Sequence, residues 1–221
     1  MREQECYLCG KKASATPEGD LTRDHLPPKN LFPQPRPDNL ITVPCCYACN
    51  NQAHKDDEYL RLGVSGYYNN NPIGKRIWKE KAVESTMRKR RLPELVATMG
   101  ESIKKIALIT PQGVKDAFEV TIERAPIDRA LTRMTKGFLA RLYPEIDRTL
   151  LTFRVTQLDQ FKVNDAGFEK IRKALYYFQR GDGVYRCWYG VDNTYLLWAF
   201  GYTCFLIPLH LLWNTGPTEN S

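Results

Sequence analysis

Two Cys-x-x-Cys pairs constrain this chain more than any other feature of its sequence. Cys6 and Cys9 form the first pair, and Cys46 and Cys49 form the second. Four thiolates at this paired spacing suit the tetrahedral coordination that structural zinc prefers. A redox site would need only one pair, usually within a thioredoxin-like strand and helix. We therefore expect one zinc ion held by all four cysteines, with the neighbouring Cys45 as an alternative ligand.

A bound metal would also stabilise a segment that has few core residues. Residues 1–62 are dense in Cys, Pro and Asn and hold too few apolar side chains to form a core unaided. The seven cysteines are an odd number, and the first residues lack the apolar stretch of a secretory signal. We expect a reducing, cytoplasmic location, where metal binding is more common than disulfide formation.

Between and after the two pairs lie polar residues that can carry chemistry. Asp24 directly precedes His25, and in an extended strand their side chains point to opposite faces, one toward a metal and one toward a water. Asn39 heads the apolar, strand-like residues 40–43, and its amide can bridge loop backbone groups. After Cys49 the sequence is helical in character, which puts Asn50 and His54 on one face.

In these residues the first 62 positions resemble the HNH family of nucleases, which have the ββα-metal fold. The resemblance rests on the two cysteine pairs, the Asp-His dipeptide, Asn39 before an apolar strand, and a second cysteine pair that leads into a helix. It implies that His25 is the general base, which suits an imidazole that titrates near neutral pH. It also implies that Asp24, with Asn50 and His54, holds a catalytic divalent ion such as Mg²⁺.

The resemblance leaves part of this site open. Many family members have a histidine where this chain has Asn50, and the next histidine is His54. Any of Asn50, Asn51 and His54 can complete the metal site. An Asp-His dipeptide alone is common in surface turns. For His54, the alternative to a metal ligand is an exposed histidine on a helix surface without a functional role.

The net charge of +7 comes almost entirely from one segment, residues 72–91. Together with the pI of about 9.0, this charge favours an anionic partner. We interpret residues 63–100 as a basic helical connector that contacts DNA phosphates, the alternative being a solvated charged face. The candidate contacts are Lys75, Arg76, Lys79, Arg88, Lys89, Arg90 and Arg91.

Residues 101–221 alternate between strand and helix signals and predict a second, α+β domain with an antiparallel sheet. We expect a hairpin over residues 106–122, a helix over 127–142, a strand over 150–155, a helix over 166–178 and a strand over 184–189. Residues 195–213 carry no charge and are long enough for a membrane helix. Their aromatic content and Gly201 favour two buried strands joined by a bend, so we expect no membrane association.

These observations lead to one interpretation and one rival. The interpretation is an α+β protein in which a zinc-braced HNH module, residues 1–62, cleaves DNA with a divalent ion. Residues 101–221 would bind DNA, dimerise or receive a protein partner, as in bacterial defence or mobile-element nucleases, a setting that only the resemblance implies. The rival is a non-catalytic zinc-knuckle module that binds nucleic acid.

Overall fold

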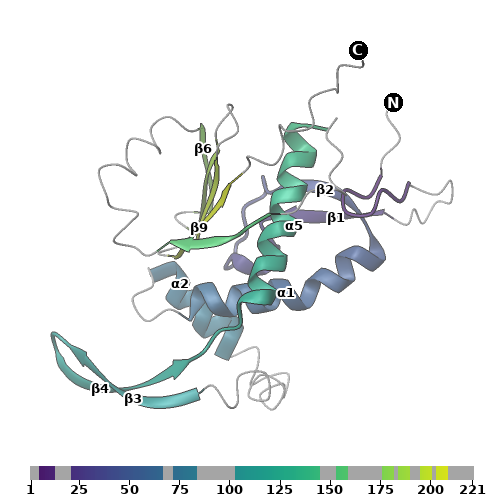
Figure 1. Cartoon of the computed structure of the whole chain (residues 1–221). Coiled ribbons are helices and arrows are strands. Elements are labelled where there is room, and N and C mark those ends of the chain that lie inside the picture. The colour runs from purple at the N-terminus through teal and green to yellow at the C-terminus, as the bar shows by residue number, and fades with distance from the viewer. Residues whose placement is uncertain are drawn as a thin grey trace.

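The computed structural model describes residues 5–12, 21–66, 72–83, 103–144, 153–158, 176–181, 184–189, 195–200 and 203–208. These residues form helices together with small antiparallel sheets, so the α+β class is confirmed (Figure 1). None of the described helices is both long and apolar enough to cross a membrane.

The first unit of the fold is a β-hairpin followed at once by a helix. Strands β1 (Leu21–Leu26) and β2 (Ile41–Cys46) pair antiparallel, with Asp24 opposite Val43 and His25 opposite Thr42. A single turn of 3-10 helix, η1 (Lys29–Leu31), lies in the connection. Helix α1 (Tyr47–Ser65) begins directly after β2. The two strands and the helix expected around the polar residues are therefore confirmed.

The basic connector is described only in part. Helix α2 (Pro72–Ile77) continues into a turn of π-helix, η2 (Trp78–Val83), which confirms a helix at the start of this segment. Four of its candidate phosphate contacts lie outside the described residues, namely Arg88, Lys89, Arg90 and Arg91.

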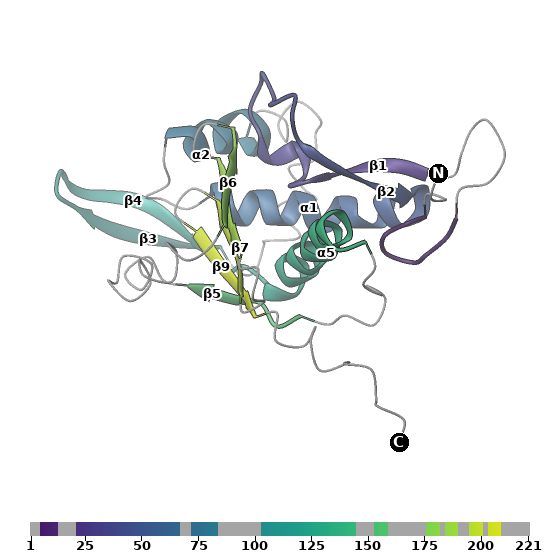
Figure 2. The same cartoon turned by 90° about the horizontal axis from the view of Figure 1, so that it is seen from above.

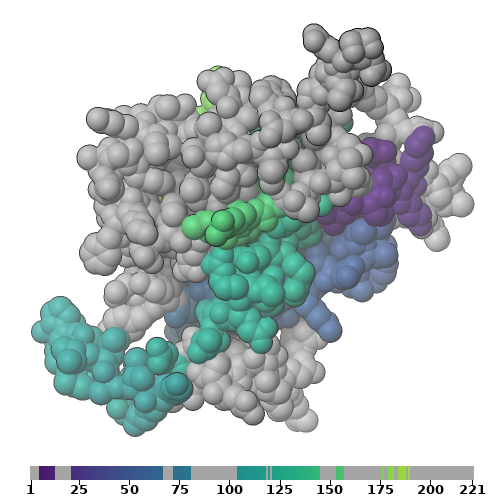
Figure 3. Space-filling model, in the orientation of Figure 1, coloured from purple at the N-terminus to yellow at the C-terminus, as the bar shows by residue number. Residues whose placement is uncertain are grey.

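Strands β3 (Ile103–Thr110) and β4 (Gly113–Val120) form the expected hairpin. It extends away from the rest of the described chain as a separate arm (Figures 1 and 3). Near its tip, Ile109 is 84% exposed and its cross-strand partner Val114 is 69% exposed.

Helix α5 (Arg124–Leu142) confirms the helix expected from the spacing of apolar residues. It packs across α1 (Figures 1 and 2) and also contacts both strands of the β1–β2 hairpin. The approach is close at Gly137, where an added Cβ would lie 2.6 Å from Leu26 Cδ1 and 3.1 Å from Tyr7 Cε2. A larger residue at position 137 would have to displace the buried Leu26 side chain, so glycine allows α5 to pack closely against β1.

The remaining strands form one antiparallel sheet in the order β5-β9-β8-β7-β6. Its members are β5 (Thr156–Leu158), β6 (Tyr176–Arg180), β7 (Tyr185–Tyr189), β8 (Tyr195–Phe200) and β9 (Thr203–Pro208). The two strands expected in residues 195–213 are confirmed as β8 and β9.

Two expectations for this region are wrong at their ends. The helix expected over 166–178 does not include Tyr176–Arg180, which is strand β6, whereas residues 166–175 lie outside the described part. Pairing with β7 across the turn at Gly181 fixes these aromatic residues as a strand. A strand is expected over residues 150–155, but residues 153–155 are not in a strand, and β5 follows them at Thr156. Residues 150–152 lie outside the described part.

The buried apolar residues form one core that joins segments distant in the sequence. Tyr7, Leu26 and Phe32 from the N-terminal unit belong to the same cluster as Leu131 and Met134 from α5. Val184, Tyr185 and Cys187, at the start of strand β7 of the large sheet, belong to it as well. The N-terminal unit is therefore covered by α5, a helix from the predicted second domain.

Candidate functional site

The four cysteines of the two pairs meet in one cluster. The sulfur atoms of Cys6, Cys9, Cys46 and Cys49 all lie within 4.8 Å of one another, and the Cys9 and Cys46 sulfurs are 3.8 Å apart. This is a four-thiolate set of the kind that binds zinc tetrahedrally. Within the part of the chain that the structure describes, it is the one group of three or more His, Cys, Asp or Glu side chains placed to share a metal.

Local structure explains why the cysteines converge. In the first pair, the Gly10 amide donates to the Cys6 carbonyl at 2.8 Å, and Gly10 has a φ of 71°, a left-handed conformation that favours glycine. The Tyr7 amide donates to the Pro44 carbonyl at 3.1 Å, which ties this turn to β2. In the second pair, Cys46 precedes α1 and Cys49 lies in its first turn, where the helix dipole favours thiolates.

The thiols differ in how readily they ionise. Burial opposes ionisation of Cys6, but hydrogen bonds from the backbone of Cys46, Cys9 and Leu8 outweigh it and lower its pKa to about 7. Burial raises the pKa of Cys49, as do its sulfur neighbours. Cys45 is fully buried and lies outside the metal-binding group, and burial raises its pKa too. Cys46, not Cys45, is therefore the member of the cluster.

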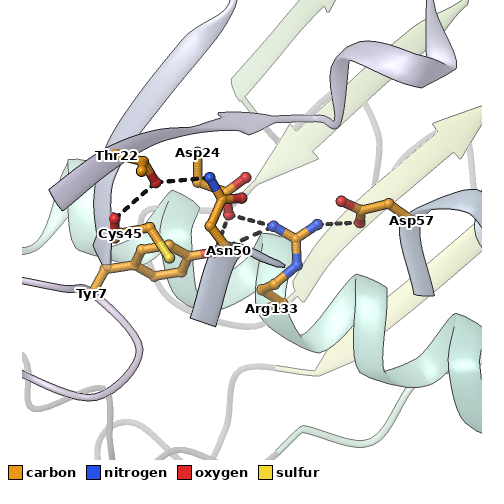
Figure 4. Close-up of polar contacts among 7 residues, drawn as sticks. All are labelled: Tyr7, Thr22, Asp24, Cys45, Asn50, Asp57 and Arg133. Atoms are coloured by element: carbon orange, nitrogen blue, oxygen red, sulfur yellow. Dashed lines mark hydrogen bonds and ion pairs between the residues drawn. The ribbon is translucent and has the colours of Figure 1, made fainter. Parts of the chain in front are cut away.

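Beside the cluster lies a buried polar network around Asp24 (Figure 4). The Tyr7 hydroxyl donates to Asp24 Oδ2 at 2.6 Å. Arg133 of α5 donates from Nη1 to the same oxygen and from Nη2 to Asp57 Oδ1. The side chains of all three charged residues are largely buried: Arg133 is 7% exposed, Asp24 5% and Asp57 13%. One guanidinium thus joins β1 to α1 through two carboxylates.

The electrostatics of this network depend on burial and on Arg133. Burial raises the pKa of Asp57 to about 6, although the Arg133 charge acts in the opposite direction. Burial also raises the pKa of Tyr7, which keeps its hydroxyl as a hydrogen-bond donor. Burial disfavours the Arg133 cation, but Tyr7, Asp57 and Asp24 together outweigh that effect and raise its pKa. Arg133 is therefore charged at every pH of interest.

Of the three candidates for completing the metal site, Asn50 has partly buried contacts, whereas Asn51 and His54 are exposed. The Asn50 amide nitrogen donates to Thr22 Oγ1 at 2.8 Å, and Thr22 donates to the Cys45 carbonyl at 2.9 Å. Figure 4 shows these contacts of Asn50 and Thr22 beside the Asp24 network. Asn51 and His54 are exposed on α1, and His54 interacts electrostatically with Asp57.

His25 is half-buried on the face of β1 opposite to Asp24. Partial burial lowers its pKa below the ordinary value of 6.5, and the positive charges of Lys29 and Arg36 lower it further. Asp24 raises this pKa, but its influence is smaller than those of burial and Lys29. At neutral pH the imidazole is therefore neutral, which is the form that can accept a proton.

The other candidate residues are spread over the surface. The Asn39 side chain is exposed, and its backbone carbonyl accepts a hydrogen bond from Arg180 Nε at 3.0 Å. Lys75 and Lys79 are exposed on α2 and η2. Arg76 is exposed as well, but it donates to Glu80 at 2.7 Å and to the Gln34 carbonyl at 2.6 Å. Its charge is therefore partly satisfied within the protein.

The arrangement around Asp24 does not fit the divalent ion that the resemblance implies. Asp24 Oδ2 already accepts from Tyr7 and Arg133, so a metal ion at this carboxylate would adjoin a guanidinium. Two unit charges about 4 Å apart repel by about 4 kcal/mol at an effective dielectric constant of about 20, and a divalent ion doubles this repulsion. Asn50 and His54 add no negative charge to offset it.

Sequence reasoning missed Arg133, Asp57 and Tyr7. Asp57 stands in the run Lys-Asp-Asp-Glu of α1, which reads as an ordinary solvated helix face. Arg133 directly precedes Met134 on the apolar side of α5. A charged residue beside the buried positions of an amphipathic helix is a usable signal, but it does not name the partner.

Comparison of the chain with family models, with curated proteins and with solved structures finds no significant match.

Proposed function

We propose that the chain is a nuclease of the ββα-metal type that hydrolyses phosphodiester bonds of DNA, with His25 as its general base. One observation supports the proposal most: a cysteine-braced hairpin and helix present His25 on the outer face of β1 in a cationic setting. Lys29 and Arg36 both act electrostatically on this imidazole. A neutral base beside positive side chains suits attack on an anionic phosphate.

The chemistry divides into two tasks for these residues. The neutral imidazole of His25 takes a proton from a water, whose oxygen attacks phosphorus while the bond to the leaving oxygen breaks and that oxygen takes a proton from solvent. Lys29 and Arg36, which are exposed, are available to hold the phosphate oxygens and offset the charge that develops on them. The four cysteines stabilise the strands and helix and take no part in the reaction.

Plasmid cleavage by the zinc-loaded chain in Mg²⁺ tests this proposal. Loss of a general base costs about 10² to 10⁴ in rate, so His25→Ala should lose cleavage in that range. Thr42→Ala is the matched control, because Thr42 lies opposite His25 in the strand register and is exposed. Zinc content and DNA affinity should be unchanged in both variants. Equal cleavage by His25→Ala and the wild type would refute the role of His25.

The second candidate is a zinc-knuckle module that binds nucleic acid without cleaving it. The pairing of Asp24 with Arg133 and Tyr7 favours this candidate, since it occupies a carboxylate that the nuclease family uses for its metal. The same assay separates the two functions. Salt-dependent DNA binding without cleavage by the wild type would support the binding module.

A further inference from the structure

We infer that Arg133 is the resident cation of the Asp24 pocket and excludes divalent metal ions from it. The pocket here means the buried network of Tyr7, Asp24, Asp57 and Arg133. If it holds, the proposed nuclease does not use Asp24 to hold a divalent ion, whereas the binding module is unaffected.

The geometry of the guanidinium carries the inference. Its two terminal nitrogens donate to carboxylates on different elements, Asp24 on β1 and Asp57 on α1. A planar guanidinium with several fixed donors can span two carboxylates in this way, whereas a lysine ammonium is a single point charge. Charge-assisted hydrogen bonds of this kind are among the strongest in proteins.

A second arginine on the same helix shows how different this environment is. Arg129, one turn earlier on α5, donates two hydrogen bonds to Asp56 of α1, at 2.9 and 2.7 Å. The Arg129 side chain is 60% exposed, so water screens its interaction with Asp56. Removal of the Arg129 charge would therefore do little for the affinity of a metal ion. Arg133 has no such screening, since its side chain is 7% exposed.

The balance of charge in the pocket supports the same assignment. Asp24 and Asp57 contribute two negative charges and Arg133 one positive charge, so one guanidinium already compensates much of the buried charge. A metal ion could bind Asp24 strongly only after the guanidinium had left that carboxylate. Removal of that cation should therefore convert the pocket into a site for a hard divalent ion, which prefers carboxylate ligands.

Titration of the zinc-loaded full chain with Mn²⁺, followed by the electron paramagnetic resonance signal of the free ion, tests the inference. Arg133→Gln should bind one Mn²⁺ at least about tenfold more tightly than the wild type, because the repelling charge is gone. Arg129→Gln is the matched control and should bind Mn²⁺ as weakly as the wild type. Zinc content and circular dichroism establish that each variant is folded.

A double variant guards against loss of folding in Arg133→Gln. Arg133→Gln with Asp57→Asn removes one charge of each sign, so the net charge of the pocket is preserved, and this variant should also gain Mn²⁺ affinity. A folded single or double variant that gains none overturns the inference. So does a tightly bound Mn²⁺ in the wild type that is lost in Asp24→Asn.

Discussion

Asp24 and His25 are neighbours in sequence but lie in different electrostatic environments. The Asp24 side chain is buried against a guanidinium and a tyrosine hydroxyl, whereas His25 is half-buried near two positive side chains. The alternation of a β-strand separates them, since successive side chains point to opposite faces. A substitution of either residue therefore leaves the direct contacts of the other in place.

The pKa of His25 gives a prediction for Lys29. Lys29→Gln should raise the pKa of His25 toward 6.5, since it removes a positive charge that disfavours the imidazolium, while burial continues to hold the pKa down. Titration of the His25 imidazole by nuclear magnetic resonance measures the change. Lys55→Gln, an exposed lysine on α1, is the control and should leave the titration unaltered. An unchanged midpoint in Lys29→Gln would contradict the electrostatic role of Lys29.

The same pKa determines how His25 affects stability. Because the folded-state pKa lies below the ordinary value of 6.5, the folded chain binds this proton less tightly than the unfolded chain does. The contribution of His25 is therefore fully present above about pH 6.5 and is lost as the pH falls below it. Lys29→Gln should reduce this loss.

At the level of single residues, the sequence predicted the four-cysteine metal-binding group well and the environment of Asp24 poorly. The cysteine pairs are local patterns whose spacing directly limits the metal geometry, so no tertiary information is needed. Arg133, in contrast, is 109 residues from Asp24 along the chain. Its position depends on how α5 packs, which no local pattern specifies.

Among the elements, the second cysteine pair has two roles at once. Cys46 ends β2 and precedes α1, and Cys49 lies in the first turn of that helix. A metal bound here holds the end of the strand, the start of the helix and the turn at Cys6 and Cys9 together. Such a site can replace the apolar contacts that residues 1–62 lack.

Removal of one zinc ligand should therefore unfold the N-terminal unit. Zinc binding at structural sites is worth on the order of 10 kcal/mol in isolated peptides, more than the stability of many domains. Cys9→Ser should lose zinc and its thermal transition, whereas the wild type should contain about one zinc per chain. Metal analysis and circular dichroism measure both.

Cys45→Ala is the matched control for that experiment. Cys45 is buried beside Cys46 but lies outside the metal-binding group, so the variant should retain zinc with only a modest loss of stability. Zinc loss in Cys45→Ala, or normal folding of Cys9→Ser, would show that the ligands are assigned wrongly.

Element prediction succeeded where one periodicity dominated and failed where two competed. Apolar residues recur at helical spacing along α5, and a Gly-containing turn separates β3 from β4, so both were predicted. The segment before Gly181 contains Tyr176, Tyr177 and Phe178, which also fit the end of a helix. Pairing with β7 decided in favour of a strand, and strand pairing is a tertiary interaction.

On the scale of the whole molecule, the N-terminal unit, α5 and strand β7 share one core. Leu131 and Met134 of α5 are fully buried in the same cluster as Tyr7 and Leu26, and Gly137 permits the close approach. The Arg133 pairs add polar contacts across the same interface. The N-terminal unit thus obtains apolar burial from a helix that begins more than 50 residues after α1 ends.

This shared core predicts that the N-terminal unit is not stable alone. A fragment of residues 1–66 retains all four cysteines but loses α5, which exposes Tyr7 and Leu26 and leaves Asp24 and Asp57 without Arg133. With zinc added, the fragment should show neither a cooperative thermal transition nor a dispersed nuclear magnetic resonance spectrum, whereas the full chain should show both.

A substitution in the full chain tests the same coupling without truncation. Leu131→Ala leaves a cavity in the shared core and should cost about 2 to 5 kcal/mol of unfolding free energy. Because the core is continuous, hydrogen exchange should accelerate in β1 and β2 as well as in α5. Leu142→Ala, at the exposed end of the same helix, is the control and should have little effect. Faster exchange confined to α5 in Leu131→Ala, together with a folded 1–66 fragment, would mean that the zinc-braced unit folds independently of the helix that covers it.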